Sequence, residues 1–125
     1  MPTSPAALSL PRGERLRQAA AFQAVFQHGR RHERPSFVAL WRPAESRRVG
    51  FAVSRQLRGA VKRNRARRRL RAAYRQVRAQ MAGAVELVVV ARASAATRPF
   101  TELVEDMRRL AEALTERPRT AAGRP

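Results

Sequence analysis

The sequence contains no cysteine, few acidic residues and no long apolar run. The absence of cysteine excludes a disulfide scaffold and a zinc site built from thiolates. No stretch approaches the roughly 18 apolar residues that a membrane-spanning helix needs, and the N-terminus lacks the basic and apolar regions of a secretory signal. At 125 residues the chain is expected to form one domain, located in the cytoplasm and without a membrane partner.

Positive charge, in contrast, is abundant. The chain has 27 Lys and Arg residues against 9 Asp and Glu, which gives a formal net charge of +18. Such a charge repels itself in the compact state, so a polyanionic partner is the simplest reason to retain it. Nucleic acid fits best, because every phosphate that the protein neutralises releases a condensed counterion. All but one of the basic residues are arginines, which suit bidentate phosphate contacts and stacking on bases.

The hydrophobic spacing predicts an α+β fold, in which a small mixed sheet of three to four strands is packed by helices in the order α-β-β-(β)-α-β-α. Helices are expected at about 15–28, 60–81 and 99–116, and strands at 36–41, 48–54 and 85–91. The ends are rich in proline and small residues. We therefore expect residues 1–12 and 118–125 to be disordered, on either side of one RNA-binding domain at 13–117.

The positive charge is concentrated in one segment. Between Ser46 and Val85 there are thirteen basic residues and no acidic one. One side of the predicted helix 60–81 is an apolar stripe, and the rest is almost wholly guanidinium. Like charges at i, i+4 destabilise an isolated helix by about 0.2–0.5 kcal/mol per pair, so we interpret this face as a polyanion site rather than an ordinary solvated surface. The predicted binding residues are Lys62, Arg63, Asn64, Arg65, Arg67, Arg68, Arg69 and Arg71.

Three uncharged residues leave alternatives open. Asn64 interrupts the basic run, and its amide either bonds RNA, orients a neighbouring arginine or bonds local backbone in the first helical turn. Phe22 and Phe26 lie one turn apart on the first predicted helix. They either pack in the core or form a platform on which bases stack.

Catalytic motifs are missing from the sequence. There is no glycine-rich phosphate loop after a strand, no HExxH pair and no nucleophile elbow. His28 and His32 flank Gly29 in what is expected to be a surface loop. Five of the 9 carboxylates fall on the last predicted helix, at ordinary surface positions. We therefore expect no catalytic residue on the protein and no cleavage of a phosphodiester by this chain alone.

One stretch is more specific than a basic helix. Residues 50–71 combine a strand that ends in Val-Ser, a glycine one short loop later and then Arg-Asn-Arg followed by further basic residues on a helix. The run FQAVFQHG at 22–29, Phe37 on the next strand and VVVAR at 88–92 complete a pattern that covers about residues 10–115. This pattern resembles the bacterial ribonuclease P protein component family.

The resemblance implies a ribonucleoprotein that removes the 5′ leader from precursor tRNA, with Mg²⁺ bound mainly by the catalytic RNA subunit. It implies that the Arg-rich helix meets ribonuclease P RNA, and that a cleft between the first helix and the sheet holds the leader. Phe22 and Phe26 match the aromatic cleft positions, whereas Leu40 stands where the family often has Tyr, so a hydrogen bond to the leader is in doubt there. A left-handed β-α-β crossover is also implied, although about 98% of such connections are right-handed.

Three other functions remain open on the residues alone. A small ribosomal or assembly protein would use the same helix to hold RNA together. A free-standing nuclease would cut precursor tRNA without a partner. A helix-turn-helix DNA-binding protein needs two short helices joined by a tight turn, whereas a strand precedes the basic helix here, so DNA is not expected as a partner.

Overall fold

The computed structural model describes residues 19–81 and 83–122, and side chains within 23–81 and 83–114. The disorder expected at 1–12 lies outside the described residues, and the backbone is helical through Ala122. The elements in chain order are α2 (Ala19–His28), β1 (Arg30–Glu33), β2 (Phe37–Pro43), β3 (Arg48–Val53), α3 (Ala60–Val77), the 3₁₀ turn η2 (Arg78–Gln80), β4 (Val85–Ala91), η3 (Ala93–Ala96) and α4 (Phe100–Ala122).

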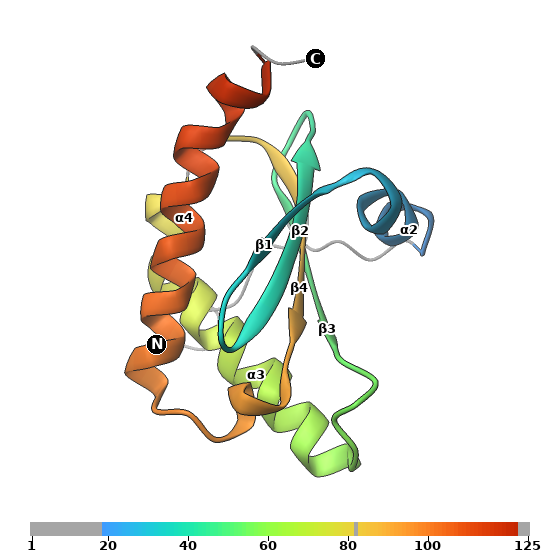
Figure 1. Cartoon of the computed structure of the whole chain (residues 1–125), viewed down its shortest axis with the longest axis vertical. Helices are drawn as coiled ribbons and strands as arrows, with labels where there is room; N and C mark the ends of the chain where they lie inside the picture. Colours follow the sequence, from blue (N-terminus) through green and yellow to red (C-terminus); the bar gives the residue numbers. More distant parts are fainter. Residues whose placement is uncertain (1–18, 82, 123–125) are drawn as a thin grey trace, which may run out of the picture.

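The strands form one mixed sheet in the order β1-β2-β4-β3. β2 runs antiparallel to β1 and β4, whereas β3 and β4 are parallel neighbours joined through α3. In Figure 1 the chain descends β3, rises through α3 on one side of the sheet and descends β4 in front of β3, which is a left-handed crossover. The predicted α+β fold with a mixed sheet is confirmed, and the optional extra strand is β1.

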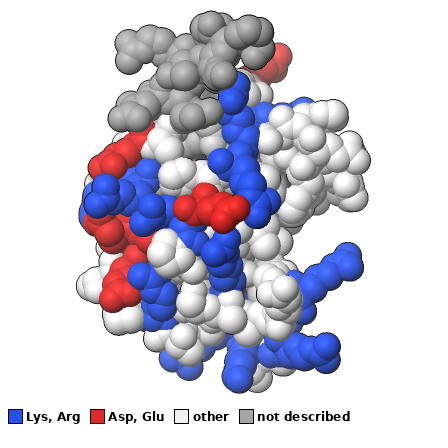
Figure 2. Space-filling model, in the orientation of Figure 1, with Lys and Arg blue, Asp and Glu red and all other residues white. Residues whose placement is uncertain are grey.

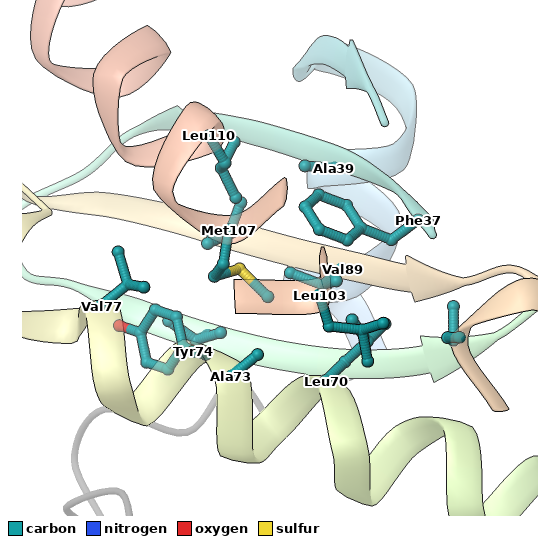
Figure 3. Close-up of a cluster of buried hydrophobic side chains, with 14 of the residues drawn as sticks. Phe37, Ala39, Leu70, Ala73, Tyr74, Val77, Val89, Leu103, Met107 and Leu110 are labelled. Carbon is teal, nitrogen blue, oxygen red and sulfur yellow. The ribbon is translucent and has the colours of Figure 1, made fainter. Parts of the chain in front are cut away.

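The main core lies between the sheet and the two long helices. α3 contributes the apolar stripe that its spacing predicts, and α4 packs beside it with Leu103, Met107 and Leu110 (Figure 3). From the sheet, Phe37 and Val89 point into the same cluster. This packing fixes which side of α3 faces inward and therefore which side carries its charges outward. The stripe residues of α3 that are buried are Ala66, Leu70, Ala73, Tyr74 and Val77.

α2 covers the opposite face of the sheet (Figure 1). Its Val25 is buried with Leu40 of β2 and Val88 of β4, and Val90 packs against this small cluster while remaining partly exposed. An apolar run as continuous as 85–91 is typical of a strand that is buried on both faces. Most of β4 is buried in this way, although Val90 on the side of α2 remains half-exposed.

A glycine joins α2 to the sheet at very close range. The amide of Gly29 donates to the carbonyl of Val25 at 2.8 Å, which ends the helix. A Cβ at this position would lie 2.5 Å from the Val25 oxygen and 3.0 Å from the Trp41 oxygen. Because both obstacles are backbone atoms, no side-chain rearrangement could make room, and only glycine fits this junction.

β1 was missed by the hydrophobic pattern, since Arg30–Glu33 contains no large apolar residue. The strand exists because its backbone pairs with β2, in a register that sets Arg30 opposite Trp41 and His32 opposite Ala39. The expectation that His32 lies in a surface loop was therefore wrong, because this residue is half-buried within a strand.

A buried carboxylate attaches α4 to the rest of the molecule. Asp106 accepts hydrogen bonds from the Ser36 hydroxyl at 2.7 Å and the Ser36 amide at 3.2 Å. It also pairs with Arg98 at 2.9 Å and with Arg34 at 3.3 Å. Five donor groups from Arg34, Ser36 and Arg98 thus converge on one side chain that is 3% exposed, so its charge is compensated locally.

Candidate nucleic-acid interface

The basic helix begins without the usual anionic or polar cap. Gly59 precedes it with a φ of 96°, and no side chain caps its first turn, which also lacks an acidic residue. The carbonyl of Gly59 accepts the first helical hydrogen bond from the amide of Arg63 at 2.9 Å. The start of α3 is therefore positive both from its dipole and from its side chains, a combination that favours an anionic partner.

Part of the predicted binding set lies on the exposed side of α3. Lys62, Asn64, Arg65 and Arg68 are exposed. Within the described part of the chain, Lys62, Arg65, Arg67 and Arg68 have no carboxylate at ion-pair distance. Figure 2 shows blue side chains extending from the lower right of the molecule, where α3 begins in Figure 1, with no red beside them. The chain thus leaves these cations available to an external anion.

Arg63 behaves differently from its neighbours. Its guanidinium Nη1 donates to two backbone carbonyls in the loop between β3 and α3, Ser54 at 3.1 Å and Leu57 at 2.9 Å. The side chain is only half-exposed. The Nη1 group of Arg63 therefore holds that loop against the first turn of the helix.

Arg69 makes the corresponding contact on the other side of α3. Its Nη1 donates to the carbonyl of Ala95 at 2.8 Å, and its Nη2 donates to the carbonyl of Arg98 at 2.5 Å. These acceptors lie in η3 and in the turn that leads to α4. Arg69 thus joins the basic helix to the segment between the last strand and the last helix.

The remaining two predicted residues are also partly covered. Arg71 lies with its guanidinium carbon 5.6 Å from the centre of the Phe51 ring, within the range of a cation–π contact. Phe51 in turn meets Tyr74 edge-on, with ring centres 5.9 Å apart. Arg67 is half-exposed. The basic run is therefore not one uniform surface, although all of its members come from the same helix.

A hollow lies on the outer side of α3. Its lining includes the exposed Asn64, Arg65 and Arg68, and it also includes Ala60 and Val61, which the charge pattern did not single out. Val61 is 81% exposed, and it and Phe26 are the exposed large apolar side chains of the described residues. An apolar floor beside amide and guanidinium groups suits contact with sugars or bases as well as phosphates. The hollow is lined by Ala60, Val61, Asn64, Arg65, Arg67, Arg68 and Arg69.

Most carboxylates of the described residues pair with arginines outside α3. Glu105 pairs with Arg108 and Arg109 along α4, at 2.7 and 3.1 Å. On β1, Glu33 pairs with Arg31 and Arg92, and the hydrogen bond from Arg31 is the main reason that its pKa lies below the ordinary value. These pairs are remote from the outer face of α3 and do not neutralise it.

The predicted leader residues lie on the other side of the sheet. Phe26 of α2 is 46% exposed, which does not fit the alternative that it is a core residue. Leu40 is only 8% exposed, because Val25 of α2 packs over it. Phe22 belongs to α2, but its side chain lies outside the described residues. The elements expected to form the leader site are therefore adjacent, with Phe26 as the exposed aromatic group among the described side chains.

The described residues contain neither a candidate metal cluster nor a helix that could span a membrane. No group of three or more His, Asp or Glu residues that could hold a metal ion occurs among them. None of the helices in the same residues has the length and apolar character required to cross a bilayer.

Comparison with known proteins gives a consistent result. The family model described as Ribonuclease P matches residues 10–115. The ribonuclease P protein component of Gluconacetobacter diazotrophicus is 41% identical over 102 residues, which cover 78% of this chain and 88% of that protein. The corresponding component of Chloroflexus aurantiacus is 39% identical over 99 residues, covering 77% and 73% of the two chains.

Solved structures agree with the sequence matches. The ribonuclease P protein from Thermotoga maritima superposes with a TM-score of 0.70 at 26% identity, covering 79% of this chain and 96% of that one. A Staphylococcus aureus ribonuclease P protein mutant superposes with a TM-score of 0.71 over 82% and 89% of the two chains; at 22% identity this likeness concerns the fold. With a family match over residues 10–115 and relatives at 39–41% identity of which it covers 73% and 88%, this chain belongs to the bacterial ribonuclease P protein component family, the protein subunits of the tRNA-processing endoribonuclease.

Proposed function

We propose that this subunit binds ribonuclease P RNA through the exposed face of α3 and the 5′ leader of precursor tRNA through the α2 side of the sheet. By bringing positive charge between two RNAs, it lowers their mutual repulsion. By contacting the leader, it favours precursor over mature tRNA, which has no leader. Both effects promote endonucleolytic removal of the leader.

One observation carries the first half of the proposal. Lys62, Arg65 and Arg68 are exposed and unpaired within the described residues, although the molecule has carboxylates that pair with arginines elsewhere. Phosphates are the ligands that would compensate these charges, and counterion release would drive the association. The hollow beside them adds an apolar surface that an RNA sugar or base can contact.

The second half rests on the partly covered face of the sheet. Phe26 is exposed beside that face, and Val38, Ala52 and Val90 on its strands are half-exposed. An unpaired leader can stack its bases on an aromatic ring, which contributes on the order of 1–3 kcal/mol per base. Leu40 offers no hydrogen-bond donor, so we propose that apolar contact and stacking dominate here.

We also propose that the RNA subunit carries out the cleavage of the phosphodiester. Mg²⁺ would be bound mainly by RNA phosphates, since the described part of the protein offers no cluster of carboxylates or imidazoles for it. Bound Mg²⁺ would supply charge stabilisation at the scissile phosphate. The protein residues bind and orient the two RNAs, and the complex would act in the cytoplasm.

The decisive experiment is reconstitution. The purified protein, a ribonuclease P RNA and a precursor tRNA are combined at low Mg²⁺, and release of the leader is measured against reactions that lack either subunit. We expect cleavage only with both subunits, and none with protein alone. Cleavage by the protein alone would make it a free-standing nuclease. An RNA subunit that gains nothing from the protein would favour a ribosomal or assembly role instead.

A further inference from the structure

The eight residues of the predicted binding set differ in what their side chains already contact. Arg63 and Arg69 together make four hydrogen bonds to backbone carbonyls, of Ser54, Leu57, Ala95 and Arg98. Arg65 lies two residues after Arg63 and Arg68 directly precedes Arg69, yet both are exposed and have no described partner. The difference divides the basic run in a way that its sequence alone does not reveal.

Helical geometry explains the division. Successive residues turn by about 100°, which sets Arg63 in line with the buried stripe at the start of the helix, Arg69 on one flank of the stripe and Arg68 on the far side of the helix. A long arginine on or beside the stripe can reach the neighbouring loop, whereas Arg68 points away from both loops. Arg63 and Arg69 each contact two carbonyl oxygens, and one guanidinium can donate to two of them because its N–H groups diverge in a plane.

We infer that Arg63 and Arg69 are positioning residues, which hold α3 between its two flanking loops, and that RNA phosphates are contacted by the exposed set Lys62, Arg65 and Arg68 together with Asn64. This inference rests on the proposed function, since it presumes that α3 is the RNA-binding element. Arg63 acts at the start of the helix, where no side chain caps the first turn and Gly59 supplies the φ of 96°. Arg69 acts six residues later, on the side of η3 and the turn before α4.

Removing either positioning arginine should have a measurable effect on RNA affinity. The loop carbonyls of Ser54 and Leu57 lose a donor when Arg63 is removed, and those of Ala95 and Arg98 lose one when Arg69 is removed. The helix then holds its exposed cations less firmly relative to the sheet. RNA affinity should fall by the same factor at every salt concentration, because the number of phosphate contacts is unchanged.

The test uses two matched pairs of variants in the full chain: Arg63→Met with Arg65→Met, and Arg69→Met with Arg68→Met. Methionine keeps much of the aliphatic stem and removes both charge and donors. Binding to ribonuclease P RNA is measured over a series of salt concentrations well below the melting temperature, and thermal unfolding is recorded separately.

For Arg65→Met and Arg68→Met we expect the slope of log K against log salt to shrink by about 0.7–0.9, with little change in Tm. For Arg63→Met and Arg69→Met we expect an unchanged slope, a Tm lower by roughly 4–8 °C and a parallel loss of affinity of about 3- to 10-fold. The parallel loss is the readout that a purely structural role, fully folded at the assay temperature, would not produce.

Three results would count against the inference. If Arg63→Met and Arg69→Met lower the slope as much as their neighbours do, the division is wrong while the proposed function stands. A slope that all four variants leave unchanged would instead remove α3 as the RNA-binding element. Should a methionine variant not fold, Arg63→Lys and Arg69→Lys retain the charge; we expect the slope to be kept and Tm to fall, and an unchanged Tm would overturn the positioning role.

Discussion

α3 and α4 lie side by side on one face of the sheet, yet they treat charge in opposite ways. Along α4, Glu105 pairs with Arg108 and Arg109, and Asp106 is buried against Arg34 and Arg98. Figure 2 shows red and blue alternating on the side where α4 lies. α3 carries a much larger net charge, because its sequence has no acidic residue to balance the basic ones. The fold therefore neutralises the arginines around α4 with its own carboxylates, whereas the positive charge of α3 remains available to an anionic partner.

The strongest test of this comparison removes the acidic centre of α4. We expect Asp106→Ala to lower the free energy of unfolding by about 3–5 kcal/mol, because two arginines and Ser36 lose a partner that is 3% exposed. Urea unfolding would measure the change. Glu105→Ala is the control. The Glu105 side chain is 46% exposed, so its ion pairs should contribute at most about 1 kcal/mol. Equal effects of the two substitutions would contradict the assignment of Asp106 as the attachment point of α4.

The second test makes α3 resemble α4. Arg68→Glu would introduce a carboxylate three residues from both Arg65 and Arg71, which should stabilise the helix by up to about 0.5 kcal/mol. It should weaken binding to ribonuclease P RNA on the order of 10- to 100-fold at moderate salt, since a phosphate contact becomes a repulsion. Arg109→Glu changes the net charge equally and should leave RNA affinity nearly unaltered. A similar loss for both variants would mean that total charge, rather than the face of α3, governs binding.

The third test concerns the face of the sheet that α2 covers, where the leader is proposed to bind. Phe26→Ala should reduce the preference for leader-bearing over mature tRNA by about fivefold or more, because a stacked base contributes on the order of 1 kcal/mol or more. The affinities of the reconstituted enzyme for the two tRNAs would be compared. Phe100→Ala, at a partly buried site of the main core, should leave that ratio unchanged. An unaltered ratio in Phe26→Ala would remove this ring from the leader site.

The smallest effect concerns the exposed pairs of β1. Arg31 and then Arg92 lower the pKa of Glu33 below its ordinary value of 4.5. A carboxyl whose pKa is lower in the folded state stabilises the fold above the unfolded pKa, and this contribution is lost as pH falls through the lowered value. Urea midpoints should therefore differ slightly between the wild type and Glu33→Gln at pH 7, and the difference should vanish in acid. A difference that persists at low pH would assign another role to this side chain.

Much of this fold follows from the spacing of apolar residues. The stripe of α3 from Ala66 to Val77 and the apolar run of β4 predict buried elements where the structure has them. The helix ends at Val77 rather than near Met81, because η2 tightens the last turn and Met81 is extended. The left-handed connection from β3 to β4 could not be derived from local chemistry, which favours the other hand. It followed from the family resemblance.

The sequence predicted one set of binding residues on α3, but it did not distinguish the arginines that contact backbone carbonyls from those that are exposed. Composition locates the basic run on α3, and the missing carboxylates distinguish it from an ordinary charged surface. The contacts of Arg69, however, reach carbonyls 26 and 29 residues away, so only the tertiary fold reveals them. A helical projection would have given a partial signal, because it sets Arg63 in line with the buried stripe and Arg69 on its flank. Val61 was missed because an isolated exposed valine is unremarkable in a sequence.

The junction at Gly29 constrains how this protein can vary. There the end of α2 and the backbone of β2 meet with no room for a Cβ, so the helix cannot approach the sheet more closely at this point. The smallest spacing between α2 and β2 is consequently set by main-chain atoms. Substitutions of Phe26 and its neighbours can change the side chains beside this junction, but the close approach of the two backbones should persist among relatives that keep the glycine.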